Sequence, residues 1–136
     1  MIGPIPSGFA EGLYRVRLQN NALSGPLPAF PESVLTIQVE ENRLSGDLAE
    51  AVANLPNLKK LNVNDNRFTG EIPATLGSVS TGVKEIRLHG NKFTGQVPSD
   101  LCILRMQNFE FKRLSVDCGR VECECCAPEC PSLFNP

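Results

Sequence analysis

The stretch that decides the fold is Val83-Lys84-Glu85-Ile86-Arg87-Leu88-His89-Gly90-Asn91-Lys92-Phe93-Thr94-Gly95-Gln96-Val97-Pro98. Its apolar spacing and its Asn and Gly recur in three earlier copies, in which the Asn is Asn21, Asn42 and Asn66, at steps of 21, 24 and 25 residues. A repeat period of about 20 to 30 residues is typical of a solenoid of stacked units. A weaker fifth copy is expected at Met106, Phe109 and Phe111, with Leu114 in place of the Asn.

Each copy predicts one short strand followed by a bend. Ile86 and Leu88 alternate with polar residues, which is the period of two that sends neighbouring side chains to opposite faces of a strand. One strand cannot bury its own apolar face, whereas copies stacked about 4.8 Å apart bury a continuous core. The Asn amide both donates and accepts, so a structural column of Asn residues can satisfy the backbone groups of the turns. Its members are Asn21, Asn42, Asn66 and Asn91. The repeated Gly, such as Gly95, is expected where a side chain would crowd the corner.

The pattern resembles the leucine-rich-repeat family in its plant-type form, L-x-x-L-x-L-x-x-N-x-L-[ST]-G-x-[IL]-P, over roughly residues 3–114. The resemblance implies an α/β leucine-rich-repeat solenoid. It has a curved parallel β-sheet on the concave face, with short helices, 3-10 turns and extended segments on the convex face. Segment 48–55 is rich in helix formers and predicts one or two helical turns, whereas the prolines of segment 28–31 leave no room for a helix.

We expect leucine-rich repeats in residues 1–114, as about four full repeats with partial ones at each end, and a Cys-rich C-terminal cap in 115–136. Segment 3–6 looks like the tail of a preceding repeat, and no cap precedes it. Because solenoids need caps at both ends, we expect a C-terminal fragment of a longer array. The tail is similar to Cys-rich tails that follow the last repeat in leucine-rich-repeat proteins of diatom type.

The cysteines predict disulfides that cover the last apolar edge of the array. They are Cys102, Cys118, Cys123, Cys125, Cys126 and Cys130, and six cysteines allow fifteen pairings among which the sequence does not choose. The alternative is a zinc ion held by the last four. The usual C-x2-C pairs are missing and no His is near, so the spacing argues against this site, and we expect no metal and no cofactor.

Composition narrows the class of protein. The chain has 136 residues, 41% of them hydrophobic, and a net charge of −2. No basic excess attracts phosphates, so we expect no nucleic-acid partner. No apolar run approaches the roughly 18 residues of a membrane-spanning helix, so no membrane segment is expected either. Disulfides predict a secreted protein or the extracellular side of a membrane, and a missing N-terminus would explain why no signal peptide is seen.

Residues that flank the buried strand positions are expected on the concave face in three columns, where the fifth copy contributes Asn108, Glu110 and Lys112. Such a polar set is typical either of a solvated sheet or of a surface that recognises an irregular ligand. The ligand-binding candidates are Arg15, Arg17, Gln38, Glu40, Lys60, Asn62, Asn64, Glu85, Arg87, His89, Glu110 and Lys112.

Catalytic patterns are weak, and we expect no enzyme. His89 is the only His, and no Ser or Cys is expected in its column or beside it. Glu85 and Glu110 are expected about 8 Å apart, within the range of inverting glycosidases. An ion pair between Arg87 and Glu110 is the simpler use of that carboxylate.

The sequence therefore predicts a non-catalytic ligand-recognition module that binds a protein, a peptide or a glycan. The alternative is a secreted inhibitor of a cell-wall-degrading hydrolase, because the repeats also resemble those of polygalacturonase-inhibiting proteins. A purely structural wall or matrix component is a third hypothesis. Fold alone does not choose among the three.

Overall fold

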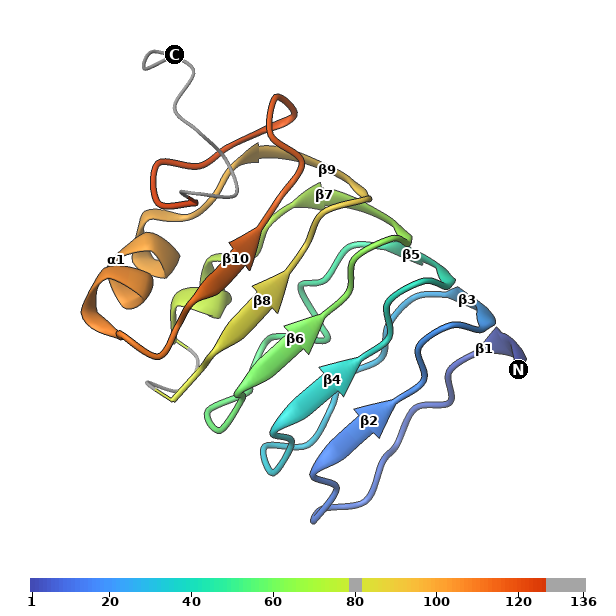
Figure 1. Cartoon of the computed structure of the whole chain (residues 1–136). Coiled ribbons are helices and arrows are strands. Elements are labelled where there is room, and N and C mark those ends of the chain that lie inside the picture. The colour runs from blue at the N-terminus through green and yellow to red at the C-terminus, as the bar shows by residue number, and fades with distance from the viewer. Residues whose placement is uncertain (79–81, 127–136) are drawn as a thin grey trace.

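The structure is a computed structural model that describes residues 1–78 and 82–126. Its strands belong to two parallel sheets, between which the chain alternates, as Figure 1 shows. One sheet has the order β10-β8-β6-β4-β2 and corresponds to the sheet expected on the concave face. We call it the concave sheet. It contains β2 (Arg15–Arg17), β4 (Thr36–Gln38), β6 (Lys60–Asn62), β8 (Glu85–Arg87) and β10 (Arg113–Ser115). The expected solenoid is confirmed.

A second parallel sheet, which was not expected from the sequence, follows the bend of each repeat. It contains β1 (Ile2–Pro4), β3 (Ala22–Gly25), β5 (Arg43–Gly46), β7 (Arg67–Glu71), β9 (Lys92–Gln96) and β11 (Val121–Glu122). The segments taken for corners are strands whose Gly has φ of +80° to +86°. At Gly25 or Gly46 an added Cβ would meet its nearest neighbour at 3.8 Å, which is an ordinary contact. At these two positions the glycine is therefore required by backbone conformation and not by crowding. At Gly95, where φ is +86°, an added Cβ would also lie 3.2 Å from Glu71 Oε1, so crowding contributes there as expected.

The convex side is irregular, as the sequence predicts. It carries the 3-10 helix η1 (Ala74–Ser78) and the helix α1 (Ser99–Gln107), which pack together. No helix lies between β3 and β4, in agreement with the prolines there. Segment 48–55 forms turns with one hydrogen bond of the α-helical type, which the Val52 N–H donates to the Leu48 carbonyl four residues earlier at 3.1 Å. It therefore contains less helix than expected. No helix in the described part of the chain is long and apolar enough to cross a bilayer.

Apolar residues of successive repeats form one continuous core between the two sheets. Ile37, Leu61 and Ile86 are fully buried in the centre of the concave strands. Phe68 and Phe93 stack behind them with ring centroids 6.2 Å apart. This shared core is what the repeat pattern predicts.

The register expected for the fifth copy is wrong. Leu114 does not replace the Asn: it pairs with Ile86 in the sheet and is fully buried. Met106 lies in α1 and is 76% exposed, and Phe109 is 92% exposed. The nine residues of α1 lengthen this repeat, so its strand begins five residues later than expected. The boundary expected at residue 114 falls inside β10, and pairing with the array continues through β11.

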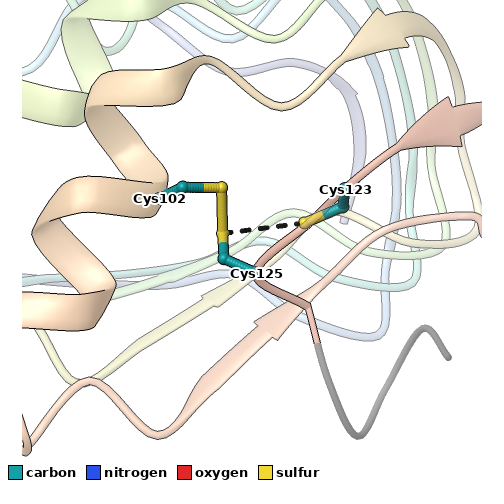
Figure 2. A group of neighbouring side chains, drawn as sticks. All are labelled: Cys102, Cys123 and Cys125. Atoms are coloured by element: carbon teal, nitrogen blue, oxygen red, sulfur yellow. Dashed lines mark hydrogen bonds between the residues drawn. A yellow bond between two sulfur atoms is a disulfide. The ribbon is translucent and has the colours of Figure 1, made fainter. Parts of the chain in front are cut away.

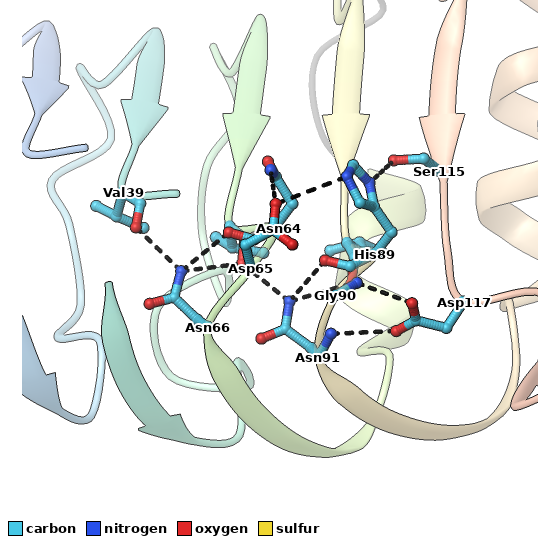
Figure 3. A network of polar contacts seen from close by, with 11 residues as sticks. Val39, Asn64, Asp65, Asn66, His89, Gly90, Asn91, Ser115 and Asp117 are labelled. Atoms are coloured by element: carbon cyan, nitrogen blue, oxygen red, sulfur yellow. Dashed lines mark hydrogen bonds and ion pairs between the residues drawn. The ribbon is translucent and has the colours of Figure 1, made fainter. Parts of the chain in front are cut away.

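The Asn column connects each repeat to the one before it (Figure 3). The Asn66 amide N–H group donates to Val63 and Asn64 of its own repeat, at 3.2 Å each, and to Val39 of the preceding one at 3.0 Å. Its oxygen accepts the Leu44 N–H at 3.0 Å. Asn42 and Asn91 make the same set of bonds, and Asn21 makes part of it. The structural role expected of this column is confirmed.

Candidate functional site

The register of the concave sheet defines three columns of side chains. The first contains Arg15, Thr36, Lys60, Glu85 and Arg113, and the second contains Arg17, Gln38, Asn62, Arg87 and Ser115. The third lies two residues further along each strand and contains Gln19, Glu40, Asn64, His89 and Asp117. Backbone bonds such as Asn20 N–H to Glu40 O (3.0 Å) and Glu41 N–H to Asn64 O (3.1 Å) continue the sheet to this third column.

The columns contain the candidates expected from the first four copies but not those from the fifth. Glu110 and Lys112 precede β10, and the Asn108 side chain donates to the Val83 carbonyl at 2.9 Å. These three positions were wrong because of the register error. Arg113, Ser115 and Asp117 take their places. The signal was in the sequence, since Phe111-x-x-Leu114-x-Val116 fits the repeat better than the apolar residues chosen.

A cluster of ion pairs surrounds Glu85 in the middle of the sheet. Its carboxylate lies 3.1 Å from an Arg87 nitrogen, 3.6 Å from Arg113 and 3.8 Å from Lys60. The Glu85 side chain is 12% exposed, whereas its three partners are 34% to 64% exposed. The expected pair between Arg87 and Glu110 is therefore wrong, and so is the suggested glycosidase pair. One carboxylate contacts three cations, so the cluster as a whole is positively charged.

Charge is segregated across the concave sheet. The first two columns hold five cations, which are Arg15, Arg17, Lys60, Arg87 and Arg113, against the single carboxylate of Glu85. The third column and the residues that follow it hold carboxylates, which are Glu40, Glu41, Asp65 and Asp117. The sheet is thus basic along its strands and acidic past their ends, although the chain as a whole carries only −2.

The polar side chains of the concave sheet are most deeply buried on β6 and just past its end. Asn62 and Asn64 are 6% and 7% exposed, while the longer side chains beside them on β4 and β8 are only half-buried. The Oδ1 atoms of both Asn residues are buried and have no hydrogen-bond partner among the described residues. The same is true of Gln19 Oε1 and Glu40 Oε2. Buried acceptors of this kind carry a desolvation cost that a donor from a ligand would remove.

His89 has polar neighbours that the sequence analysis missed. Its Nδ1 lies 2.6 Å from Ser115 Oγ, and its Nε2 lies 3.9 Å from Asp65 Oδ2 (Figure 3). The expectation that no serine lies beside His89 is therefore wrong. A Ser–His–Asp triad needs the base hydrogen-bonded to both partners, and 3.9 Å is too long for the second bond. The His89 and Asp65 side chains are also 37% and 49% exposed, so water reaches the group.

Asp117 closes the last turn of the Asn column. Its two carboxylate oxygens accept the Gly90 N–H at 2.8 Å and the Asn91 N–H at 3.1 Å (Figure 3). Asp117 therefore supplies acceptors to the Gly90–Asn91 turn from the following repeat, which has Gly119 at the position of the Asn. Its carboxylate also extends the acidic side of the sheet.

The tail forms disulfides, as the sequence predicts, and one of them joins it to the array. Cys102 on α1 pairs with Cys125, as Figure 2 shows. Cys123 pairs with Cys126. Cys118 is also disulfide-bonded, and Cys130 lies outside the described residues. The sulfur atoms of Cys102, Cys123 and Cys125 lie within 4.8 Å of one another. Metal ligation by cysteine requires thiolates, so these bonded sulfurs are not available to a zinc ion while the disulfides are intact.

Known proteins share both the sequence pattern and the fold. The family model described as Leucine Rich Repeat matches residues 57–79 and 82–104. Receptor-like protein 35 of Arabidopsis thaliana is 38% identical over 69 residues, which are 50% of this chain and 7% of that protein. The chain therefore spans less than a tenth of this curated relative.

Solved structures of plant receptors show the same architecture. The Arabidopsis receptor kinase HAESA, in complex with the peptide hormone IDA and the co-receptor SERK1, is 29% identical with a TM-score of 0.69. The match covers 85% of this chain and 19% of HAESA. The structure described as PEPR1–AtPEP1 is 28% identical with a TM-score of 0.77, over 90% of this chain and 17% of that one.

Proposed function

We propose, from the premise that this chain is a leucine-rich-repeat protein of the plant type, that its concave sheet is a non-catalytic binding surface for a peptide or a protein segment. The observation that carries the proposal is the charge segregation on this sheet. Three cations around Glu85 offer hydrogen-bond donors to an anionic group, and carboxylates lie past the strand ends. A peptide carries both charge signs on one flexible chain, so it can satisfy both sides at once.

Two further observations support a peptide over the other ligand classes. The three columns contain no Phe, Tyr or Trp side chain on which a sugar ring could stack. The similar HAESA structure contains a peptide hormone. Rigid stacking of the repeats holds the polar groups in fixed positions, which reduces the entropy lost on binding.

We also propose that the chain acts outside the cell, as part of a longer protein. Disulfides such as Cys102–Cys125 form and persist in oxidising compartments. The exposed His89 group lacks the second hydrogen bond and the exclusion of water that nucleophilic catalysis uses, which supports a binding role.

The test is a peptide-display selection against the immobilised, oxidised chain. We expect enriched peptides to carry Asp or Glu, and their affinity to fall at least about tenfold in Arg87→Glu, because a charge-assisted contact is replaced by repulsion. The matched control is Arg43→Glu, which changes an exposed arginine on β5 of the second sheet and should leave the affinity unchanged. If no peptide is enriched, or if both variants weaken binding equally, the concave sheet is not the binding surface.

The hydrolase-inhibitor hypothesis would use the same face and is separated by its readout. Loss of polygalacturonase activity at a one-to-one ratio with this chain would favour the inhibitor over a peptide receptor. Equal hydrolase activity with and without the chain would leave the peptide-binding proposal as the better one.

A further inference from the structure

We propose that the acceptor row, defined as Gln19, Glu40 and Asn64, binds a cationic hydrogen-bond donor of the ligand, such as a guanidinium or an ammonium group. The inference deepens the proposed function and rests on it, since it names the group that the acidic side of the sheet recognises. Each of the three side chains has a buried oxygen with no hydrogen-bond partner among the described residues. Native proteins pair nearly all such atoms with protein groups or ordered water, so three oxygens in one row offer acceptors that the donors of a ligand can occupy.

Asn64 presents its oxygen rather than its nitrogen to the row. Its Nδ2 donates to Asp65 Oδ2 at 2.8 Å, which fixes the orientation of the amide (Figure 3). The residue is 7% exposed, so the amide has little freedom to turn. The remaining oxygen is therefore a positioned acceptor that has no donor among residues 1–78 and 82–126.

The three acceptors lie on neighbouring chain segments. Backbone bonds from Asn20 to Glu40 and from Glu41 to Asn64 hold these segments side by side. Adjacent strands are about 4.8 Å apart, so the row extends over roughly 10 Å. Gln19 and Glu40 are only half-buried and have long side chains, so they can move apart to admit a ligand group. The carboxylate in the middle favours a positive charge there.

The spacing suits an organic cation better than a metal ion. Calcium gathers six to eight oxygens at about 2.3–2.6 Å, which a row of three spread-out acceptors with one carboxylate does not offer. A guanidinium group presents five N–H donors that point outward in one plane, and an ammonium group presents three. One such group can therefore donate hydrogen bonds to several separate acceptors. Asp65, hydrogen-bonded to Asn64, adds a second negative charge nearby.

The distance between the acceptor row and the cations predicts how the charges are spaced along a bound peptide. Along a strand, the second column, which contains Arg87, lies two residues from the third column, and the first column, which contains Lys60, lies four residues from it. At 3.3 Å per residue these separations are roughly 7 and 13 Å. We therefore expect a bound peptide to carry a basic group within about this distance of an acidic one. The acidic group then faces the cations around Glu85.

The experiment uses nitrogen-15-labelled chain with its disulfides intact and small probes in place of the unidentified ligand. Acetyl-arginine amide is compared with acetyl-citrulline amide, which has nearly the same shape but no charge, and with calcium chloride at equal ionic strength. NMR follows the side-chain amides of Gln19 and Asn64 and the backbone amide of Glu40. We expect saturable shifts with the arginine probe, at a Kd at least about fivefold lower than for the citrulline probe.

Variants test the carboxylate. Glu40→Gln should weaken the arginine probe at least about fivefold, because it replaces a charge-assisted bond with a neutral one. Glu50→Gln makes the same change in an exposed turn between β5 and β6 and should leave the Kd unchanged. If Glu40→Gln does not fold, the comparison of arginine with citrulline on the unaltered chain still decides whether the acceptor row prefers a positively charged group.

Three results would overturn the inference: no saturable shift, equal Kd values for arginine and citrulline, or the same shifts with calcium alone. Its failure is distinguishable from failure of the proposed function. Selected peptides that bind the concave sheet without any basic residue would keep the binding surface and refute the acceptor row. Arginine binding without any enriched peptide would do the reverse.

Discussion

Replacing Asn66 with Ala tests whether the Asn column holds the repeats together. The buried Asn66 amide makes four hydrogen bonds, one accepted from Leu44 of the preceding repeat and three donated to carbonyls. Alanine removes all four while keeping the backbone. The expected loss of stability follows from which of the four partners would be left without another hydrogen bond.

The three carbonyls each keep a second donor. Val39 O still accepts from Asn42 Nδ2 at 3.0 Å, Val63 O from Asn91 Nδ2 at 2.9 Å, and Asn64 O from the Glu41 N–H at 3.1 Å. The Leu44 N–H has a single proton, and that proton is directed at the lost Asn66 oxygen. Asn66→Ala therefore leaves one buried donor unpaired.

An unpaired buried donor costs about 1–3 kcal/mol, and the weakened bonds at the three carbonyls add about 1 kcal/mol. The free energy of unfolding should fall by about 2–4 kcal/mol. With an m-value of about 2 kcal/mol per molar urea, the unfolding midpoint moves down by about 1–2 M. Far-UV circular dichroism is the suitable readout, because the chain has no Trp and one Tyr.

The control is Asn54→Ala, the same change at an exposed residue whose amide donates to Glu32 Oε1 at 2.8 Å. It should move the midpoint by less than about 0.3 M. Hydrogen exchange provides a local readout, since the Leu44 amide should lose protection in Asn66→Ala before its neighbours do. A midpoint for Asn66→Ala equal to that of Asn54→Ala would refute the reasoning.

Three further changes test the turn, the backbone strain and the cap. Gly90→Ala should lower the unfolding free energy by more than about 2 kcal/mol, because φ is +71° and the new Cβ would lie 2.9 Å from the Asp65 nitrogen. Glu41→Asn should raise it by about 0.5 kcal/mol, because Glu41 has φ of +58°, a conformation that Asn adopts more readily. Replacing Cys102 and Cys125 together with Ser should cost about 3 kcal/mol, as the bond closes a loop with a sequence separation of 23. Urea unfolding measures all three.

Each of these changes has a matched comparison. Gly119→Ala introduces a Cβ at positive φ but into open space, so it should cost only about 1 kcal/mol, and equal losses at Gly90 and Gly119 would contradict the role of Asp65. A destabilised Glu41→Asn would show that the strain at that turn is offset by contacts of Glu41. Serine at Cys123 and Cys126, whose separation is 3, should cost about 2 kcal/mol, and a larger loss there than for the first pair would contradict the loop-entropy argument.

Much of the fold was predictable from local pattern. Leu61 and Ile86 are fully buried, and Asn66 and Asn91 make the bonds expected of them. These predictions hold because the apolar residues and the Asn keep the same offsets within each of the first four copies, so the position of a residue in the pattern determines which way it faces. The second sheet was missed because its strands lie where each repeat has a Gly, a residue that the sequence analysis took to mark a corner.

The candidate site was predictable only where the repeats are regular. Ten of the twelve concave candidates lie in the columns, but Glu110 and Lys112 do not, because α1 lengthens the last repeat and moves its strand. That one shift hid the contact between His89 and Ser115 and the role of Asp117. A helix length is set by packing against the neighbouring repeat, which no local pattern contains.

The sequence by itself determined the repeat, the buried positions of the regular copies, the Asn column and the formation of disulfides by the tail cysteines, since all of these follow from periodicity and residue chemistry. Only the tertiary structure decided which charges meet. Glu85 gathers Lys60, Arg87 and Arg113 from three strands, and the row of unpaired oxygens crosses three repeats. The physical reason is that contacts between strands depend on register, and the register of each strand depends on the lengths of the loops that precede it.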